Sequence, residues 1–485
     1  MEISSFLDAD LSAAIPLAAA RSNVAWQGQR AVTREPIGQV YRWGLRSMLQ
    51  TDEADALGVD EYAMEDSWGF VTTKDLHFEV NGKPFWPAGT NAFYMAQYDK
   101  YTDDEVYEQF RAHSSRGVTL MRIFAFSNGD GEGEIPLPVP IQPTLGVYNE
   151  TALARLDLVL AAARKFGVRV ILTLANFEDF YGGMRWYVDQ VYNTTADKDL
   201  FYVSEEIRSY YREYAELLIT RLNTVTGVSY RDDPTVFSWE LMNEPHTNNA
   251  YEAERNITSG TIVLDWIKEM SAFIKSLDSN HMVSTGEEGY RTRGNTDCCV
   301  NNWLNDGLKG VDFDANTAVP EIDFATVHAY PDNWGVPANI TINWFGKYFL
   351  AQRARIAHNL GKPILMEEYG SMWNTTSSRN DLIAYLQDQA NILGYAGTLV
   401  WEVQEANSTG IDIDLPYVFT YDDLDNGGEA VLAQYAHMET KTLQGVTCVA
   451  NTAVYGAEPA KGEAYTRNVT TTPLEGYWER RTPRI

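Results

Sequence analysis

The 485-residue chain has few cysteines, a deficit of basic residues and no long apolar run. Without a stretch of about 18 or more uncharged apolar residues, a membrane-spanning helix is excluded. The apolar run Leu11–Ala20 follows acidic residues where a signal peptide carries basic ones, so we do not interpret it as a signal peptide. Three cysteines make no disulfide framework. Cys298 and Cys299 are adjacent and Cys448 is distant, which leaves open either one bridge to Cys448 or three buried thiols.

The chain has 38 basic and 67 acidic residues, which gives a formal net charge of −29. Such a field repels nucleic acid and anionic membranes, so we expect neither as a partner. No dense Asp/Asn/Gly loop has EF-hand spacing, and we expect neither a metal nor a cofactor. Seven Asn-x-Ser/Thr sequons, about twice the chance number, favour a secreted protein. They start at Asn149, Asn193, Asn256, Asn339, Asn374, Asn407 and Asn468.

Short apolar runs alternate with amphipathic stretches over most of the chain, which is typical of parallel βα units. Eight apolar runs predict strands at Trp86–Gly89, Leu120–Ala125, Val168–Ala175, Val236–Met242, Met282–Gly286, Phe324–Ala329, Ile364–Glu368 and Thr398–Val403. Amphipathic patterns predict helices at Thr102–Arg116, Thr151–Phe166, Glu205–Leu222, Ile262–Leu277, Trp344–Leu360 and Arg379–Leu393.

Eight such units close a barrel, so the sequence predicts an α/β fold: a (β/α)₈ barrel with an N-terminal extension and long loops. The rival is an open doubly wound sheet, but no Gly-x-Gly-x-x-Gly follows the first predicted strand. We assign residues 1–60 to the extension, 61–444 to the barrel and 445–485 to a tail. Within Phe78–Phe85, the pair Asn81-Gly82 joins two β-type runs and predicts a hairpin.

Functional groups of such a barrel gather at the carboxyl ends of its strands. The fourth predicted strand delivers Glu244 and the seventh delivers Glu368. Two carboxyl groups from opposite sides of the mouth suit glycosidic cleavage, one donating a proton to the leaving oxygen and the other attacking the anomeric carbon. An isolated glutamate at a strand end is usually solvated or paired with a structural arginine, but two with polar or aromatic neighbours argue for catalysis.

Neighbouring strand ends supply groups that suit this chemistry. Asn243 can hold the 2-hydroxyl of the sugar, and Arg122 can keep the nucleophile ionised through a charge-assisted hydrogen bond. His328 and Tyr330 can orient the two carboxyl groups, although a histidine alone is more often a satisfied core residue. Trp401 offers a flat apolar platform for a pyranose face.

Other acidic and polar residues near these strand ends have a weaker case. Glu240 and Glu367 are neighbours that we discount, because strand alternation is expected to point Glu367 away from Glu368. His246, Glu287 and Glu288 also follow strands, with functional and structural interpretations evenly balanced.

The ordered motifs of the chain resemble the clan of (β/α)₈ retaining hydrolases that includes glycoside hydrolase family 5, and within it the endo-β-1,4-mannanases. The motifs are Gly89-Thr-Asn-Ala-Phe93, Leu145-Gly-Val-Tyr-Asn-Glu150, Tyr181-Gly-Gly183, Arg221-Leu-Asn-Thr-Val-Thr-Gly227, Trp239-Glu-Leu-Met-Asn-Glu-Pro245, Ile322-Asp-Phe-Ala-Thr-Val-His-Ala-Tyr-Pro331 and Lys362-Pro-Ile-Leu-Met-Glu-Glu-Tyr-Gly370. The resemblance implies Glu244 as acid/base and Glu368 as nucleophile, with Arg122, Asn243, His328, Tyr330 and Trp401 around them. It also implies that Asn243 and His246 face the C2 hydroxyl that distinguishes mannose from glucose.

The chain departs from the resembled family at two points. Many mannanases have Asn-Asn-Trp before the Tyr-Gly-Gly element, where this chain has Asn176-Phe177-Glu178, so Phe177 or Phe180 must supply any aromatic surface there. A glutamine often follows the tryptophan of the eighth strand, where this chain has Glu402.

The sequence therefore predicts a secreted, monomeric, retaining endo-β-1,4-mannanase that acts on β-mannan polysaccharides and manno-oligosaccharides. The two catalytic carboxyl groups are expected to lie about 5–5.5 Å apart. The alternatives are another family 5 β-glycanase, such as a cellulase, an exo-β-mannosidase, or a non-catalytic carbohydrate-binding barrel. The balance of hydrolysis and transglycosylation stays open, since a sugar can intercept a glycosyl-enzyme.

Overall fold

A computed structural model describes residues 68–97, 101–130, 137–192, 194–247, 250–292, 304–336, 341–372, 376–405 and 417–448. The predicted extension, residues 1–60, lies outside this range, as do Cys298, Cys299 and the tail beyond residue 448. Among the described residues, no helix is both long enough and apolar enough to cross a membrane.

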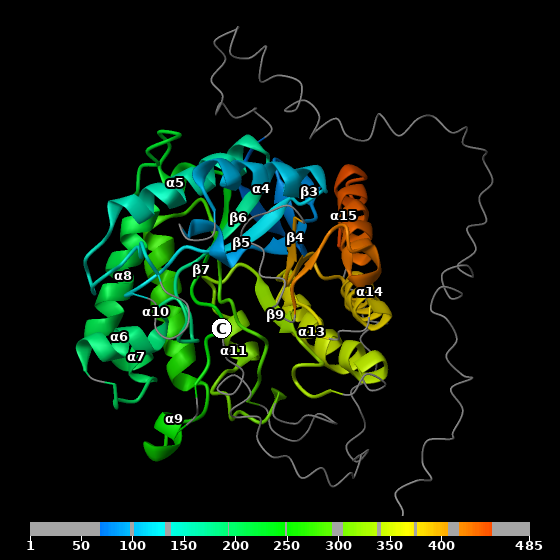
Figure 1. The fold of residues 1–485 in the computed structure, drawn as a ribbon. Helices are drawn as coiled ribbons and strands as arrows, with labels where there is room; N and C mark the ends of the chain where they lie inside the picture. The colour runs from blue at the N-terminus through cyan, green and yellow to red at the C-terminus, as the bar shows by residue number, and fades with distance from the viewer. Residues whose placement is uncertain are drawn as a thin grey trace, which may run out of the picture. The chain divides into compact units, whose positions relative to one another are not determined.

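Eight parallel strands form the barrel at the centre of Figure 1. They are β4 (Ala88–Asn91), β5 (Leu120–Phe124), β6 (Arg169–Thr173), β7 (Val236–Glu240), β8 (Met282–Ser284), β9 (Ala325–Ala329), β10 (Ile364–Tyr369) and β11 (Gly397–Val400). Strands that are neighbours in chain order pair with each other, except β8 and β9, and β11 pairs with β4. All eight predicted strands are confirmed, with ends displaced by up to three residues.

One position in the ring is closed without a strand ladder. The described residues of β8 and β9 share no ladder, and a single residue before β9 substitutes for it. The backbone N–H of Asp323 donates to the carbonyl of Val283 at 2.9 Å, and the Asp323 carboxylate accepts from the N–H of Val283 at 2.7 Å. The barrel is therefore closed by ladders on all sides but one.

Helices surround the barrel and connect its strands (Figure 1). They are α4 (Asp103–Ser115), α5 (Glu150–Lys165), α6 (Met184–Val191), α7 (Leu200–Val203), α8 (Glu205–Thr220), α9 (Ala250–Glu254), α10 (Thr261–Leu277), α11 (Phe313–Thr317), α13 (Ala351–Asn359), α14 (Thr376–Leu393) and α15 (Gly428–Leu443). Short 3-10 helices occur at η3 (Phe93–Ala96), η4 (Tyr230–Asp232) and η8 (Leu424–Asn426). A reciprocal capping box between Thr102 and Glu105 explains why α4 begins where it does.

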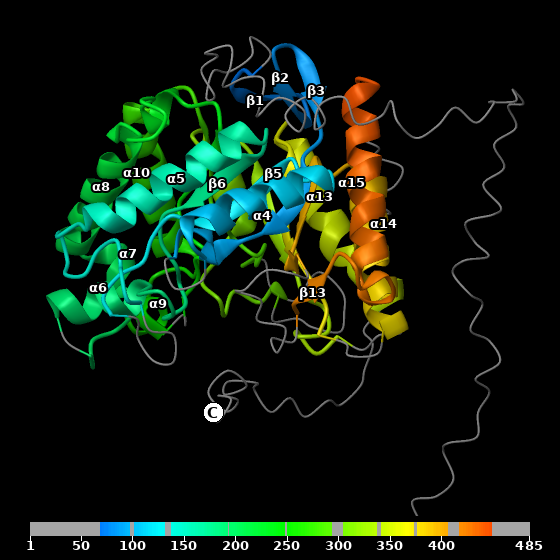
Figure 2. The same ribbon diagram turned by 45° about the horizontal axis from the view of Figure 1, so that its top comes forward.

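Two helical features differ from the sequence prediction. The single helix expected at Trp344–Leu360 is a π-helical segment, η7 (Thr341–Leu350), that continues into α13. Helix α15, which lies beside α14 in Figures 1 and 2, has no counterpart among the helices predicted from the sequence. It begins at Gly428, directly after the N-cap residue Gly427, and two glycines at its start weaken the helical pattern in the sequence.

The predicted hairpin is confirmed and covers one end of the barrel (Figure 2). It is formed by β2 (His77–Val80) and β3 (Lys83–Phe85), with β1 (Val71–Lys74) added along β2. Asn81 and Gly82 both have positive φ, 51° and 75°, as a type I′ turn requires. The Phe78 ring packs edge-on against Phe237 and Phe324, with centroids 4.9 and 5.3 Å away. The hairpin therefore closes the amino-terminal end of the barrel with an apolar core.

The last described residues pack against the barrel. The indole N–H of Trp86 donates to the carbonyl of Val446 at 2.8 Å, and the thiol of Cys448 contacts the carbonyl of Gly394 at 3.5 Å. Burial raises the pKa of the Cys448 thiol, as expected for a structural rather than a reactive cysteine. A two-residue pair, β12 (Val403–Gln404) with β13 (Phe419–Thr420), lies beyond β11.

Candidate active site

Glu244 lies just after β7 on backbone held in an unusual conformation. Its φ is 52°, a left-handed value that residues with a side chain rarely adopt and that is typical of functional sites. Its N–H donates to the carbonyl of Gly286 at 2.8 Å. Gly286 is required there, because a Cβ on it would lie 2.0 Å from the carbonyl oxygen of Met242. This close approach of two strand ends fixes the direction of the Glu244 side chain.

Glu368 lies within β10, on the far side of the barrel mouth from β7. One of its oxygens accepts from Nη1 of Arg122, and the other accepts from the hydroxyl of Tyr330 at 2.7 Å. Only 4% of its side chain is exposed, against 18% for Glu244. Glu368 is therefore enclosed by donors, whereas Glu244 keeps access to solvent.

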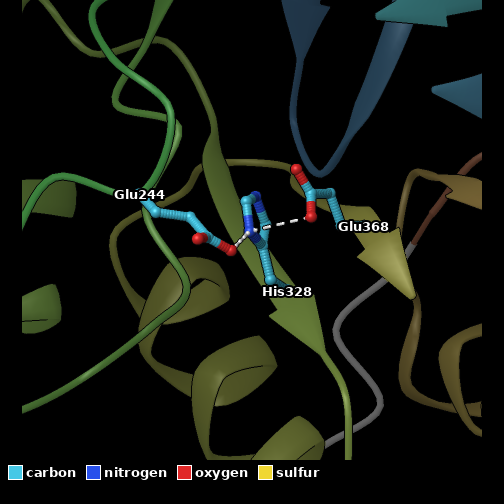
Figure 3. Close-up of side chains that lie close together, drawn as sticks. All are labelled: Glu244, His328 and Glu368. Atoms are coloured by element: carbon cyan, nitrogen blue, oxygen red, sulfur yellow. Dashed lines mark hydrogen bonds and ion pairs between the residues drawn. The ribbon is translucent and has the colours of Figure 1, made fainter. Parts of the chain in front are cut away.

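Figure 3 shows His328 lying between the two glutamates. Its Nδ1 shares a hydrogen bond of 2.6 Å with Oε1 of Glu244 and lies 3.4 Å from Oε2 of Glu368. The backbone register places His328 on β9 directly beside Glu368 on β10. One oxygen of each glutamate and this ring nitrogen all lie within 4.8 Å of one another.

Burial separates the protonation states of the three groups. Burial raises the pKa of Glu244 to about 7, with Arg122 and Lys309 opposing it. Burial also raises the pKa of Glu368, whereas the Arg122 guanidinium opposes that shift and favours the ionised form. Burial lowers the pKa of His328 to about 4, so its ring is neutral in the neutral pH range. The site therefore holds one carboxyl group that keeps its proton toward neutral pH, Glu244, and one whose ionised form is favoured by an arginine, Glu368.

Arg122, on β5, binds more carboxyl groups than the sequence indicated. Besides Glu368, it donates through Nε and Nη2 to Glu240 at 2.7–3.1 Å, and through Nη1 to Asn91 at 3.2 Å. Glu240, which the sequence analysis discounted, is thus the main partner of this arginine. Both side chains are fully buried. Removing either partner would therefore leave an uncompensated buried charge, which ties the arginine to Glu240.

The expected strand alternation is wrong at Glu367. Its Oε2 lies 3.9 Å from Nε of Arg122 and 3.5 Å from Nε2 of His328, so its carboxyl group faces the same interior as that of Glu368. The physical reason is a register irregularity in β10 between Met366 and Glu368, which interrupts the alternation of side chains.

Asn243 is fixed by the same network. Its side-chain oxygen accepts from Nη2 of Arg122 at 2.6 Å, and its amide nitrogen donates to Oδ1 of Asn176 at 3.0 Å. The Asn243 amide therefore has one N–H left to direct toward a ligand.

Two groups of aromatic rings flank the carboxyl groups on different strands. Trp401, after β11, stacks on Phe93 with centroids 5.1 Å apart and planes 3° apart, and Tyr181 packs edge-on against Phe93. On the other side, His246 stacks on Phe177 at 3.5 Å. Phe180 stacks on Phe124, on the Trp401 side. The two phenylalanines considered as replacements for the missing tryptophan thus lie on different sides.

His246 lies apart from the Asn243 network. Its Nδ1 contacts the carbonyl of Glu244 at 2.9 Å and lies 3.6 Å from Glu288, whose carboxyl group accepts from the hydroxyl of Tyr290. Burial, and then Lys309, lower the pKa of His246 well below its ordinary value. His246 is therefore a neutral ring on the Glu244 side of the mouth.

Glu287 and Glu288 separate into different environments. Glu288 faces Glu244 and His246, whereas Glu287 hydrogen-bonds with Thr285 at 3.1 Å and with Asn316 at 3.4 Å. Burial raises the pKa of Glu287 to about 8, so it is a neutral structural acid in the neutral pH range. Of the two, Glu288 belongs to the site.

The spacing of Glu244, His328 and Glu368 is also short enough to enclose a cation. The Arg122 guanidinium already supplies a positive charge to Glu368, and His328 is hydrogen-bonded to Glu244. Each of the two carboxyl groups therefore already has a partner within the protein.

Several residues that the structure brings into the site had no role predicted from the sequence. Asn91 binds Arg122, Asn176 binds Asn243, and Phe93 stacks on Trp401. Asn91 and Phe93 belong to the motif Gly89–Phe93, so the strand-end rule applied to the first barrel strand would have found them. Glu240 carried no such signal, because its role depends on where Arg122 lies.

A barrel with a carboxylic acid and a carboxylate from β7 and β10 at its mouth has the arrangement of a glycoside hydrolase. A family model described as GH family 5 beta-mannosidase-like matches residues 68–390. Mannan endo-1,4-beta-mannosidase 1 of Solanum lycopersicum is 33% identical over 70% of this chain and 84% of its own. Mannan endo-1,4-beta-mannosidase 1 of Oryza sativa subsp. japonica is 36% identical over 66% and 71%.

A solved structure agrees with the sequence relatives. The endo-1,4-beta-mannanase from Rhizomucor miehei superimposes with a TM-score of 0.66 at 29% identity, covering 77% of this chain and 100% of its own. The chain belongs to the β-mannosidase-like group of glycoside hydrolase family 5 and is a glycoside hydrolase.

Proposed function

We propose that this protein is a retaining endo-β-1,4-mannanase that cleaves internal bonds of mannan, glucomannan or galactomannan. The observation that carries the proposal is the approach of Glu244 and Glu368, which have oxygens within 4.8 Å of each other. Retaining glycosidases hold their two carboxyl groups about 5–5.5 Å apart, whereas inverting ones need about 6.5–9.5 Å to admit a water. The names of the two plant relatives and of the Rhizomucor structure support mannan as the polymer.

In the first step, Glu368 attacks the anomeric carbon while Glu244 protonates the leaving oxygen. Arg122 and Tyr330 hold the attacking carboxylate in its ionised form and fix its direction. The raised pKa of Glu244 keeps a proton available near neutral pH. The C–O bond to the leaving sugar breaks, and an ester to Glu368 forms.

In the second step, Glu244, now a carboxylate, takes a proton from water as that water attacks the anomeric carbon. The 18% exposure of its side chain gives this water access. The ester breaks, Glu368 is released as a carboxylate, and Glu244 recovers its proton. Two inversions at one carbon give net retention.

The two aromatic groups match the two halves of the substrate. The N–H of Trp401 donates to the carbonyl of Tyr369, the residue after Glu368, at 2.8 Å. The Trp401–Phe93 stack therefore lies on the Glu368 side, where the sugar under attack must bind. The Phe177–His246 stack lies on the Glu244 side, where the leaving chain must bind. Flat rings on both sides suit a polymer that continues past the cleavage point in both directions.

The test compares mannohexaose with cellohexaose on one preparation. We expect a higher kcat/KM on mannohexaose, because a site fitted to the axial C2 hydroxyl leaves buried polar groups unpaired with the wrong sugar. Equal or better turnover of cellohexaose would make the protein a β-glucanase.

Products of galactomannan digestion should be oligosaccharides of several lengths; mannose alone would indicate exo action. Proton NMR should show the β-anomer first, and the α-anomer first would exclude retention.

We also propose that the protein is secreted and monomeric. Of its sequons, Asn149 and Asn256 start within the described residues; Asn256 is exposed, whereas the Asn149 side chain accepts from the N–H of Thr151. Expression in a eukaryotic secretory host should give a mass that falls on treatment with an N-glycosidase. Light scattering should give the mass of one chain, and a dimer mass would contradict that part.

A further inference from the structure

Behind the two catalytic glutamates lies a second pair of carboxyl groups, Glu240 and Glu367, that the mechanism above does not use. Both side chains are fully buried. Glu240 accepts from Arg122 through three contacts of 2.7–3.1 Å and from the hydroxyl of Thr173 at 2.9 Å. Glu367 reaches the same arginine only at 3.9 Å.

The charges of this interior do not balance if every carboxyl group is ionised. Three carboxyl groups, those of Glu240, Glu367 and Glu368, contact one guanidinium, and the neighbouring His328 is neutral. A buried carboxylate without a paired cation is strongly disfavoured, so at least one of the three holds a proton. Glu367, with the longest contact to Arg122, is the group left without charge compensation.

The electrostatics of the pair agree with this assignment. Burial and then the neighbouring Glu240 raise the pKa of Glu367 well above its ordinary value. Burial alone would raise the pKa of Glu240 as well, but Arg122 overcomes it and brings the pKa below its ordinary value. Between these two carboxyl groups, a neutral Glu367 is the only available hydrogen-bond donor.

A neutral carboxylic acid has one donor and one acceptor, and the two ends of Glu367 have different neighbours. Its O–H is directed to Glu240, and its Oε2 lies 3.5 Å from Nε2 of His328. An acceptor beside Nε2 favours the imidazole tautomer with its proton on that nitrogen. The lone pair of Nδ1 then faces Oε1 of Glu244, 2.6 Å away.

We infer that Glu367 is a positioning residue: in its neutral form it donates to Glu240 and keeps the proton of His328 on Nε2, so that Nδ1 accepts the acidic proton of Glu244. This inference rests on the proposed function, because it assigns Glu244 as the acid. In this tautomer, no N–H of His328 faces the Glu244 carboxyl group. The ionised form of Glu244 is therefore not stabilised by the ring, and Glu244 keeps its acidic proton toward neutral pH.

Glu367 and Glu244 are surrounded by partly the same charged and titratable groups. Glu367 is faced by Glu240 from β7, Arg122 from β5, His328 from β9 and Glu368 from its own strand. Glu244 is faced by His328, Arg122, Glu240, Glu368, Lys309, Glu288 and Glu178. His328, Arg122, Glu240 and Glu368 face both residues, and among the described residues His328 is the one whose side chain is hydrogen-bonded to Glu244.

The kinetic test compares Glu367→Leu with Glu367→Gln. Leucine removes donor and acceptor, which frees His328 to place its proton on Nδ1 and stabilise ionised Glu244. We expect kcat on mannohexaose to fall about 10-fold or more, with KM within about twofold and the alkaline limb of the pH profile moved to lower pH. Glutamine has an N–H donor and a carbonyl acceptor in the places of the neutral acid, so it should restore most of the lost kcat and the position of the limb.

The matched control is Glu240→Gln, which removes the ionised partner of Arg122. Glu240→Gln should lower kcat, whereas Glu367→Gln should keep most of it. A Glu367→Gln variant as impaired as Glu367→Leu would overturn the inference, since it would show that Glu367 must be ionised. An alkaline limb that does not move in Glu367→Leu would also overturn it; if that variant does not fold by circular dichroism, the contrast between the two glutamine variants decides.

The tautomer itself can be measured without substrate. Nitrogen-15 NMR of the wild-type protein labelled at its seven histidines, with His328 assigned by loss of its signals in His328→Asn, should show a neutral ring protonated on Nε2. A ring protonated on Nδ1 would overturn the inference. This measurement separates the two proposals, because a protein inactive on mannan but protonated on Nε2 would contradict only the proposed function.

Discussion

The two ends of the barrel interior are built from opposite chemistry on the same strands. At the amino-terminal end, Phe78 of the hairpin packs between Phe237 and Phe324 in a fully apolar cluster. At the carboxyl-terminal end, Arg122 binds carboxyl groups from β7 and β10. Strands β5, β7 and β10 each begin in the apolar cluster and carry a member of the charged network toward their other end.

The comparison shows how a barrel separates stability from chemistry. Apolar burial stabilises without directional requirements, so the closed end can accept any shape that fills it. Buried charges contribute little net stability but fix directions, because each is costly unless its partners are in place. The mouth therefore depends on the rigid lower half to hold its charges at fixed positions.

The largest expected effect breaks the mouth alone. Glu244→Ala and Glu368→Ala should each lower kcat by at least about 10³-fold, because each removes one half of the double displacement. Initial rates on mannohexaose with circular dichroism will measure activity and fold together. Glu287→Gln is the matched control, since Glu287 is a buried acid after β8 that faces Thr285 and Asn316. Activity near the wild-type level in either alanine variant would refute the assignment.

The second effect breaks the closed end alone. Phe78→Ala should lower the free energy of unfolding by about 3–5 kcal/mol through lost burial and a cavity between two other rings. The kcat of the remaining folded enzyme should stay within about twofold, measured well below the melting temperature. Val147→Ala, at a side chain that is 54% exposed, should change stability by less than about 0.5 kcal/mol. A large loss of kcat in folded Phe78→Ala would mean that the two ends are not separable.

A smaller effect tests one contact at the mouth. Tyr330→Phe removes the hydroxyl that donates to Glu368 at 2.7 Å. A hydrogen bond to a charged group contributes about 1.5–3 kcal/mol, so kcat should fall roughly 10- to 100-fold. Steady-state kinetics should show KM little changed, and an unchanged kcat would remove Tyr330 from the machinery.

The smallest effect is a difference in pH response. Glu244 must be protonated and its pKa is about 7, so kcat/KM should fall as pH rises through about 7. Glu368 must be ionised and burial raises its pKa, so activity should also fall on the acid side, above the ordinary titration range of glutamate. Phe78→Ala should keep both limbs in place, because the apolar cluster contains no titratable group. Limbs displaced by that variant would show that the closed end influences the charges.

The barrel could be predicted because its signals are local. Each strand is a short apolar run, and the turn at Asn81-Gly82 has its own residue preference. Glu244 and Glu368 could be found because strand ends meet at one face of the barrel. The direction of the Glu367 side chain could not be predicted, because it depends on an irregularity in the pairing of β10 with β9. The importance of Glu240 also required the three-dimensional position of Arg122.

The pairing of β4 with β11 sets a condition on synthesis of the chain. Thr398 pairs with Ala88, 310 residues earlier, so the exposed edge of β4 has no partner until almost the whole barrel has been made. At about 5–20 residues per second, that interval lasts roughly 15 to 60 seconds. Contacts between such distant residues also slow folding itself, because a long loop must close before they form. The first barrel strand is therefore the part of a nascent chain for which shielding by a chaperone matters longest.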